Sequence, residues 1–350
     1  MTMPPTTSEI EAMAIVTAKN ELLMLFHKDK KEWLYQLKHA TDLADRADAI
    51  VALSKMKSDD EVLAALGDAL RNDNAWGIRA NAADALGELG GPAASKPLLD
   101  ALNTAKEPWV RNRVVAALGN FKGDSAIAAK LDSIARDDSS YRARAAALQA
   151  LGRLKASSAL ATLEAAVGAD SPDGFLRNAA LRAMGPLNDD KAVPLLLQWS
   201  GPGKQIDSRN AAIASLARLK KDDHDITKQI AAYLAEPHFR VRMASIFALG
   251  SRGDNSAIPA LEALLKKDDL SIEMVPMVKG QIERLKNPAG AKGAAHGETY
   301  DEGEDENDES AEASGGQAVI TNRLDKLERL VQEMNDRLKS IETRLPPPKP

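Results

Sequence analysis

An arginine recurs along the chain at nearly constant intervals, and an acidic residue precedes most of its copies. The arginines are Arg46, Arg79, Arg111, Arg144, Arg177, Arg209 and Arg242, with successive gaps of 33, 32, 33, 33, 32 and 33 residues. The carboxylates that precede them are Asp45, Asp73, Glu107, Asp138, Asp207 and Glu236. Arginine and a carboxylate can form a catalytic pair, but a feature present in every unit of a repeat is more typical of architecture. We predict an arginine–carboxylate ladder that joins the turns of adjacent repeats.

The other residues with catalytic or metal-binding potential lack the spacing that such chemistry needs. No two of the five histidines are three or four residues apart, so no helical pair of them can share a metal. The chain has no cysteine, which excludes disulfides, cysteine-ligated zinc and thiol catalysis. Gly201-Pro202-Gly203-Lys204 lacks the spacing of a phosphate-binding loop. We therefore predict no catalytic residue, no metal and no cofactor.

The segment around each arginine has a helical pattern, roughly Arg-x-x-Ala-x-x-Ala-Leu-Gly. In the second unit, Asp59 to Asn72 and Trp76 to Glu88 carry apolar residues at helical spacing and are separated by a short turn. The alanines are small enough to let neighbouring helices approach closely. The glycine of the unit, Gly87, lies in the last turn of the second helix, and Gly90-Gly91-Pro92 ends that helix. A helical hairpin alone cannot bury its apolar face, so the hairpins must stack. The pattern predicts an all-α solenoid of seven to eight hairpins.

The charge distribution argues against nucleic acid and membrane partners. The net charge is −5, and Glu298 to Glu312 contain nine carboxylates with no lysine or arginine, so the remainder has 46 basic and 51 − 9 = 42 acidic residues. A nucleic-acid binder usually shows a strong basic excess. No run of 18 apolar residues exists, and the first twenty residues lack the features of a signal peptide. We expect a cytoplasmic protein.

The composition changes after the last repeat. We predict an N-terminal leader at 1–30, the solenoid at 31–287, a disordered acidic linker at 288–317, a coiled coil at 318–345 and a proline-rich end at 346–350. The coiled coil follows from apolar residues at alternating steps of four and three, namely Ile320, Leu324, Leu327, Val331, Met334, Leu338, Ile341 and Leu345. This heptad predicts a homo-oligomer, either dimer or trimer. The alternative is a single amphipathic helix docked on the solenoid.

A partner-binding surface is the remaining functional prediction. The first, fifth and ninth positions after each repeated arginine are expected to face outward, and they change from acidic to basic to apolar along the chain. We hypothesise that a protein partner docks near Arg182, Arg218, Met243 and Phe247, because exposed apolar residues bordered by polar ones often mark an interaction site. The alternative is that Met243 and Phe247 pack in the core.

The repeat unit resembles the HEAT-like repeats that are named after the phycobilisome lyases. The resemblance covers about Leu34 to Leu285. It implies a HEAT/armadillo-type α-α superhelix, and it carries little information on function. The function we expect is a non-catalytic scaffold for protein–protein interaction that self-associates through its coiled coil.

A second resemblance concerns Lys19-Asn20-Glu21-Leu22-Leu23, the stretch from Phe26 to Leu37, and Asp45-Arg46-Ala47-Asp48-Ala49. These residues resemble the start of the C-terminal helical region of bacterial zinc aminopeptidases of the aminopeptidase N type. That region encloses the active site and governs peptide access. The zinc motif of those enzymes is absent here, so no catalytic residue is carried over. The alternative functions are thus a detached access-controlling region and, ranked below it because no basic groove is evident, a HEAT-like DNA-repair protein.

Overall fold

The computed structural model describes residues 28–287 except 57–58, 106, 157 and 268–269. The described part contains sixteen α-helices, four short 3₁₀ helices and no strand. The α-helices are α2 (Lys30–His39), α3 (Leu43–Ser54), α4 (Asp60–Asn72), α5 (Trp76–Leu89), α6 (Gly91–Thr104), α7 (Pro108–Leu118), α8 (Ser125–Asp137), α9 (Tyr141–Leu154), α10 (Ala159–Val167), α11 (Phe175–Leu187), α12 (Val193–Ser200), α13 (Ile206–Leu216), α14 (His224–Ala232), α15 (Phe239–Arg252), α16 (Ile258–Leu265) and α17 (Met274–Lys286). The 3₁₀ helices are η1 (Pro172–Gly174), η2 (Asp190–Ala192), η3 (Tyr233–Ala235) and η4 (Asn255–Ala257).

The helix starts follow local sequence signals. The Asp59 side chain accepts a hydrogen bond from the Val62 amide at 2.9 Å, which satisfies one of the free amides at the start of α4. Asp29 and Glu32 form a reciprocal capping box at the start of α2. The end of α5 is set by Gly90, whose φ of 64° lies in the left-handed region that favours glycine.

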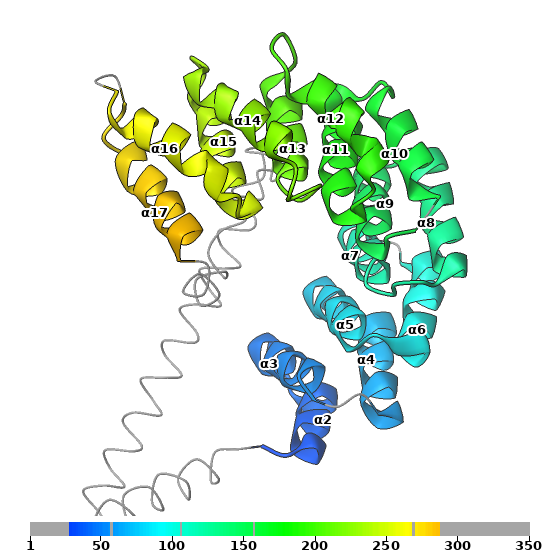
Figure 1. The fold of residues 1–350 in the computed structure, drawn as a ribbon. Coiled ribbons are helices and arrows are strands. Elements are labelled where there is room, and N and C mark those ends of the chain that lie inside the picture. The colour runs from blue at the N-terminus through cyan, green and yellow to red at the C-terminus, as the bar shows by residue number, and fades with distance from the viewer. Residues whose placement is uncertain (1–27, 57–58, 106, 157, 268–269, 288–350) are drawn as a thin grey trace, which may run out of the picture. The chain divides into compact units, whose positions relative to one another are not determined.

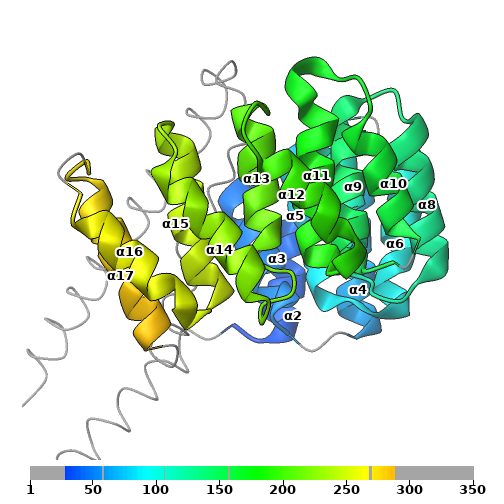
Figure 2. The ribbon, with the colours of Figure 1, turned by 45° about the horizontal axis from the view of Figure 1, so that its top comes forward.

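The helices pair into eight hairpins, which confirms the predicted all-α repeat architecture. Each even-numbered helix packs against the odd-numbered helix that follows it. The odd-numbered helices from α3 to α17 also pack against one another in sequence and form what we call the inner layer, on the inner side of the row in Figure 1. The even-numbered helices lie outside them, and Figure 2 shows the same two layers from another angle.

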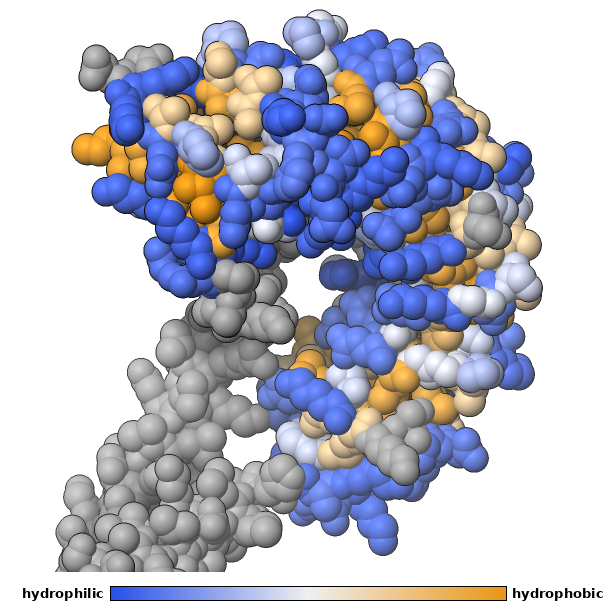
Figure 3. All heavy atoms as spheres, viewed as in Figure 1, coloured by the Kyte–Doolittle hydropathy of each residue, from blue (hydrophilic) through white to orange (hydrophobic). Residues whose placement is uncertain are grey.

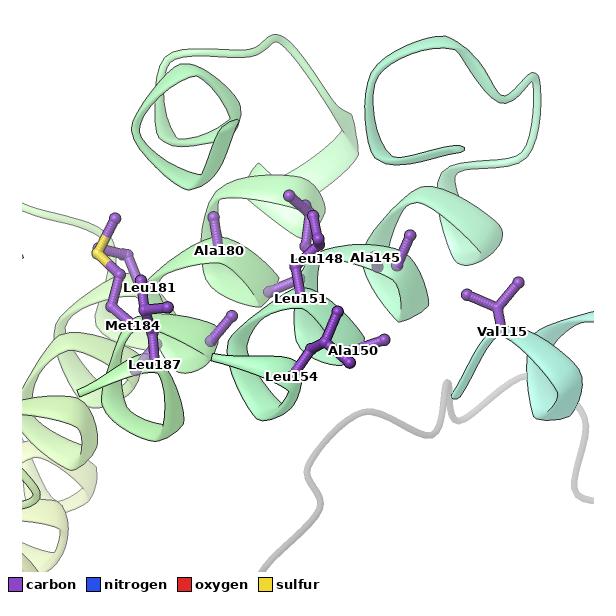
Figure 4. Packing of buried hydrophobic residues seen from close by; sticks show 14 of the residues in the cluster. Val115, Ala145, Leu148, Ala150, Leu151, Leu154, Ala180, Leu181, Met184 and Leu187 are labelled. Carbon is purple, nitrogen blue, oxygen red and sulfur yellow. The ribbon is translucent and has the colours of Figure 1, made fainter. Parts of the chain in front are cut away.

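One continuous apolar cluster runs through the stacked hairpins. Leu148 and Leu151 of α9 and Leu181 of α11 are fully buried in it, and Figure 4 shows their packing side by side. Burial of a leucine side chain contributes about 1.5–3 kcal/mol. Because every hairpin shares this cluster with its neighbours, its stability depends on adjacent repeats.

The repeated glycines lie in or directly after the last turn of the inner helices, as predicted, and they are also contact points between neighbouring inner helices. Helices α5 and α9 continue two residues beyond Gly87 and Gly152. A Cβ placed on Gly87 would lie 2.9 Å from the Cβ of Ala117 in the next inner helix, and one on Gly119 would lie 2.7 Å from the next repeat's backbone. The glycine and the second alanine of the motif therefore meet across repeats, and their small size sets the helix separation.

The predicted ladder is present, and each ion pair joins one repeat to the turn of the next. The shortest nitrogen–oxygen distances are 2.9 Å for Arg46–Asp73, 2.8 Å for Arg79–Glu107, 2.6 Å for Arg111–Asp138 and 2.7 Å for Arg209–Glu236. At Arg177 the Gln205 side-chain amide takes the carboxylate's place, at 2.9 Å. Asp207 was expected to belong to the ladder but pairs with Arg240 at 2.8 Å.

The ladder arginines also satisfy backbone groups of their own repeat. Arg209 donates from Nε to the Ser200 carbonyl at the end of α12, at 3.0 Å. Arg144 and Arg177 make the equivalent bonds to Ala135 and Val167. The last carbonyls of a helix have no partner within that helix, and the arginine Nε binds one of them. The Nη atoms of the same arginine face the next repeat.

Several sequence predictions fall on residues that the structure does not describe. These are most of the leader, the acidic linker, the proline-rich end and all of the heptad residues from Ile320 to Leu345. Among the helices that are described, none is long and apolar enough to cross a membrane.

Candidate functional site

The four predicted partner-binding residues lie on three neighbouring elements of the inner layer. Arg182 is half-buried in α11, Arg218 is exposed just after α13, and Phe247 of α15 is 36% exposed. Met243 is half-buried and packs against the apolar cluster, which favours the alternative that it belongs to the core. The first position after the repeated arginine turns toward the adjacent helix, and Ala145 at the same position is buried.

Arg182 and Arg218 are brought close by the packing of α11 on α13. The Ser215 hydroxyl donates to the carbonyls of Leu181 and Arg182, at 2.6 and 3.3 Å. The aliphatic part of Arg218 lies over Gly185, where an added Cβ would be 3.2 Å from the Arg218 Cδ. Long arginine stems commonly cover apolar surface while the guanidinium faces water.

Arg153 of α9 belongs to the same surface, although our hypothesis left it out. It occupies the ninth position after Arg144, as Arg218 does after Arg209, so the repeat register pointed to it. Its Nη2 donates to the Ala116 carbonyl at 2.9 Å, and burial lowers the pKa of its guanidinium. Within residues 28–287, apart from the gaps, the side chains of Arg153, Arg182 and Arg218 have no carboxylate partner.

The charge of the side chains on the inner layer changes along the solenoid. Helices α9, α11 and α15 contain no carboxylate, and the single one in α13, Asp207, is paired. By contrast α5 carries Asp84 and Glu88, and burial raises the pKa of Asp84 despite its pairing with Arg113. We call Arg153, Arg182, Arg218 and Phe247 the inner basic surface. Figure 3 shows that hydrophilic residues cover most of the face in view, with hydrophobic residues in patches.

A row of exposed apolar side chains marks the start of the inner helices, and sequence analysis missed it. Its members are Leu43, Trp76, Trp109, Tyr141, Phe175, Phe239 and Ile272. All but the last stand two or three residues before a repeated arginine, so an alignment of the repeats would have revealed them. The Arg142 guanidinium lies 5.0 Å from the Trp109 ring centre and that of Arg144 lies 5.9 Å from Tyr141. The second contact is made by a ladder arginine, and attraction between a cation and an exposed ring contributes about 0.5–1 kcal/mol.

A buried arginine is the second feature that sequence analysis missed. Arg252 is 2% exposed and stands ten residues after Arg242, where the preceding repeats have Leu154, Leu187 and Leu219. Its five donors are all used, since Nε binds the Thr227 hydroxyl at 2.7 Å and the two Nη atoms bind four carbonyls. The four carbonyls belong to Leu216, Leu219, Lys220 and Asp223.

Asp254 extends this network. It accepts hydrogen bonds from Thr227 at 2.6 Å and His224 at 2.8 Å. Burial alone would raise the pKa of Asp254, but bonds from Thr227, Ser256 and His224 outweigh it and hold that pKa well below its usual value. The network fixes the 217–223 loop, in which Lys220 has a left-handed φ of 40°. The Thr227 hydroxyl and His224 both contact Asp254 here, and their hydrogen bonds belong to this structural network.

Among the residues that can be described, no group of three or more histidine or acidic side chains is placed to hold a metal ion.

Comparison with known proteins defines the family. Residues 31–119, 128–217 and 204–273 match the model for HEAT repeats, so the chain belongs to the HEAT repeat family. A search of curated proteins found no match.

The chain is also similar to several solved structures. The structure of the CpcE–CpcF complex of phycocyanin lyase from Nostoc sp. PCC7120 is 21% identical, with 74% of this chain and 95% of that chain covered and a TM-score of 0.45. Human deoxyhypusine hydroxylase is also 21% identical, over 74% of this chain and 94% of that chain, with a TM-score of 0.35. Neither score supports a functional conclusion. The resemblance to aminopeptidases is not shown by these comparisons and stays a prediction.

Proposed function

We propose that this protein is a non-catalytic scaffold that binds a protein partner on the inner basic surface. The observation that carries the proposal is that three arginines without carboxylate partners and the exposed Phe247 lie on successive elements of the inner layer. Arginine and aromatic residues dominate the binding energy of protein interfaces, and arginines without a carboxylate partner are available to an acidic ligand. Membership of the HEAT repeat family supports a binding role, because stacked repeats create extended concave surfaces.

Reversing two charges tests the surface directly. We expect Arg182→Glu/Arg218→Glu to reduce capture of partner proteins from lysate of the source cells by at least about tenfold, since like charges across an interface repel. The matched control is Lys130→Glu/Lys191→Glu, which makes the same change at exposed lysines outside the inner layer. Equal capture by both variants, quantified by mass spectrometry, would rule out this surface. Loss with the first variant alone would support it.

Replacing Phe247 with alanine separates binding from folding. Because the ring is 36% exposed and lies outside the apolar cluster, we expect the melting temperature to fall by no more than about 4 °C. Capture of the partner should fall severalfold in the same variant. A core phenylalanine would instead cost about 3–5 kcal/mol, so a much larger drop in melting temperature would remove Phe247 from the site.

We further propose that the chain self-associates through the heptad residues from Leu324 to Leu345. The support is the strict alternation of four- and three-residue steps in the sequence. Light scattering should give two or three times the chain mass of 37.5 kDa for the full chain. Leu324→Asp/Leu338→Asp should give the monomer mass, because both residues lie on the apolar seam. Thr343→Asp, off the seam, should leave the mass unchanged, and a monomeric unmodified chain would refute the proposal.

A further inference from the structure

We infer that Arg177 binds an acidic side chain of a partner protein, at a point where the ladder lacks its own carboxylate. We call each ladder arginine together with its acceptor in the next repeat a rung. The expected ligand is a carboxylate with an apolar group beside it. The site contains Arg177, Lys204, Gln205 and Phe175, none of which belongs to the inner basic surface, so the inference does not rest on the proposed function.

The Arg177 rung has a neutral acceptor, whereas four other rungs have a charged one. In those four, an arginine contacts a carboxylate of the next repeat at between 2.6 and 2.9 Å. Arg177 instead donates from Nη1 to the Gln205 side-chain oxygen at 2.9 Å and from Nε to the Val167 carbonyl at 3.2 Å. It forms no ion pair in the described part of the chain. The guanidinium therefore has no internal counter-ion and keeps donors for a ligand.

Lys204 places a second positive charge beside the first. Its Nζ lies 4.5 Å from the centre of the Trp199 ring, and the Arg177 Cζ lies 4.7 Å from the same centre. Trp199 is half-buried and packs against the apolar cluster, so its ring is a fixed support for both cations. Among the described residues, Asp170 and Asp173 of the connection before α11 form an ion pair with neither cation. A carboxylate that binds Arg177 is attracted by both charges.

Gly174 lets the guanidinium lie directly against the start of α11. A Cβ built at Gly174 would be 2.7 Å from the Arg177 Nη1 and 3.0 Å from the Gln205 side-chain oxygen, so a larger residue would displace both. The residue after this glycine is Phe175, whose ring is 38% exposed. The site therefore offers an aromatic surface next to the unpaired cation.

The observations favour a carboxylate of a protein over a phosphate. The complete rungs hold a carboxylate at the equivalent guanidinium, and Arg209 binds Glu236 through both Nη atoms. A phosphate backbone is recognised by a surface with a strong basic excess, whereas this chain has a net charge of −5. Arginine and aromatic residues together are typical of the centre of a protein interface. The partner thus supplies the carboxylate that the other repeats supply themselves.

Trp199 can report on this site, because both cations lie against its ring. The full chain with Trp33→Phe, Trp76→Phe and Trp109→Phe has Trp199 as its only tryptophan. The probe is 3-phenylpropionate, which joins a carboxylate to an aromatic ring, and the reference compound is the neutral 3-phenylpropanamide. At constant ionic strength, the emission of Trp199 should change saturably with the acid, at a half-saturating concentration at least about tenfold below that of the amide.

A carboxylate supplied from within the chain should block the site. We expect Gln205→Glu to complete the rung and to raise the half-saturating concentration of 3-phenylpropionate at least about tenfold, with no loss of melting temperature. The matched control is Asn103→Asp, which makes the same change from amide to carboxylate at an exposed position of α6 and should have no effect. Lys204→Gln should weaken binding severalfold, because it removes the second charge.

Four results would overturn the inference. These are a Trp199 emission that does not respond to 3-phenylpropionate, equal half-saturating concentrations for the acid and the amide, a Gln205→Glu variant that binds as tightly as the unmodified site, and tighter binding of inorganic phosphate than of 3-phenylpropionate. Circular dichroism checks that each variant is folded. If the variant with a single tryptophan does not fold, the arginine Nε signals of the unmodified chain in nuclear magnetic resonance spectra report the same titrations.

Discussion

Replacing Gly152 with alanine is expected to lower the free energy of unfolding by about 3 kcal/mol, near the upper end of the usual cost of overpacking. An added Cβ would lie 3.0 Å from both the carbonyl carbon and the Cα of Ala183, and closer still to its carbonyl oxygen. These are backbone atoms of α11, so no side-chain rotation relieves the contact. The two helices must separate, and the buried residues around Leu151 lose packing. Urea unfolding followed by circular dichroism measures the effect.

The matched control is Gly77→Ala in α5. No atom lies within 4 Å of a Cβ built there, and its backbone is helical. Alanine is favoured over glycine in a helix by about 1 kcal/mol, so this variant should be as stable as the unmodified chain or more so. If both variants changed stability equally, the glycines would not set the helix separation. A Gly152→Ala variant as stable as the unmodified protein would contradict the prediction directly.

Replacing Arg252 with alanine is expected to cost about 3–5 kcal/mol, the range observed when one member of a buried charged network is removed. The substitution leaves the Thr227 hydroxyl and four carbonyls without their donor. It also releases the loop in which Lys220 has its left-handed conformation. Thermal and urea unfolding report the loss. Hydrogen exchange should show the added opening at residues 217–223.

Two further variants separate the arginine's polar role from simple space filling. Arg252→Leu restores the residue type of the preceding repeats but supplies no donor, so we expect it to be nearly as unstable as Arg252→Ala. Arg284→Ala removes an exposed arginine of α17 and should change stability by less than about 0.5 kcal/mol. A stable Arg252→Leu variant would mean that the five hydrogen bonds contribute little.

The network around Asp254 also predicts a direction of pH dependence. The pKa of Asp254 is lower in the folded chain than in the unfolded chain, because its hydrogen bonds favour the ionised form. The stabilisation is therefore complete above the unfolded pKa of about 3.9 and decreases as the pH falls below it. Asp254→Asn should remove this contribution, so the difference in stability from the unmodified chain should narrow below pH 4.

The sequence by itself determined the repeat, its helices and much of the ladder. Arg46, Arg79 and Arg111 recur at a fixed interval, and the period of apolar residues between them is a local property of the chain. The turn carboxylates Asp73 and Glu107 stand 27 and 28 residues after the arginines that they pair with, close to one repeat length, so the repeat predicts where each pair forms. The repeat also allowed Arg182 and Arg218 to be placed on the inner face from the sequence.

Only the tertiary structure decided which residues meet between repeats. The sequence placed the repeated glycine in the last turn of its helix, but only the close approach of α9 to α11 shows that a side chain at Gly152 would meet the backbone of Ala183. The sequence left open whether Met243 faces outward or packs in the core, and in the structure it is half-buried against the apolar cluster. Arg252 occupies a core position normally held by leucine, and no local pattern shows that one hydroxyl and four carbonyls converge on it. Periodicity fixes each helix, whereas partners on adjacent helices depend on packing distances that a single sequence does not contain.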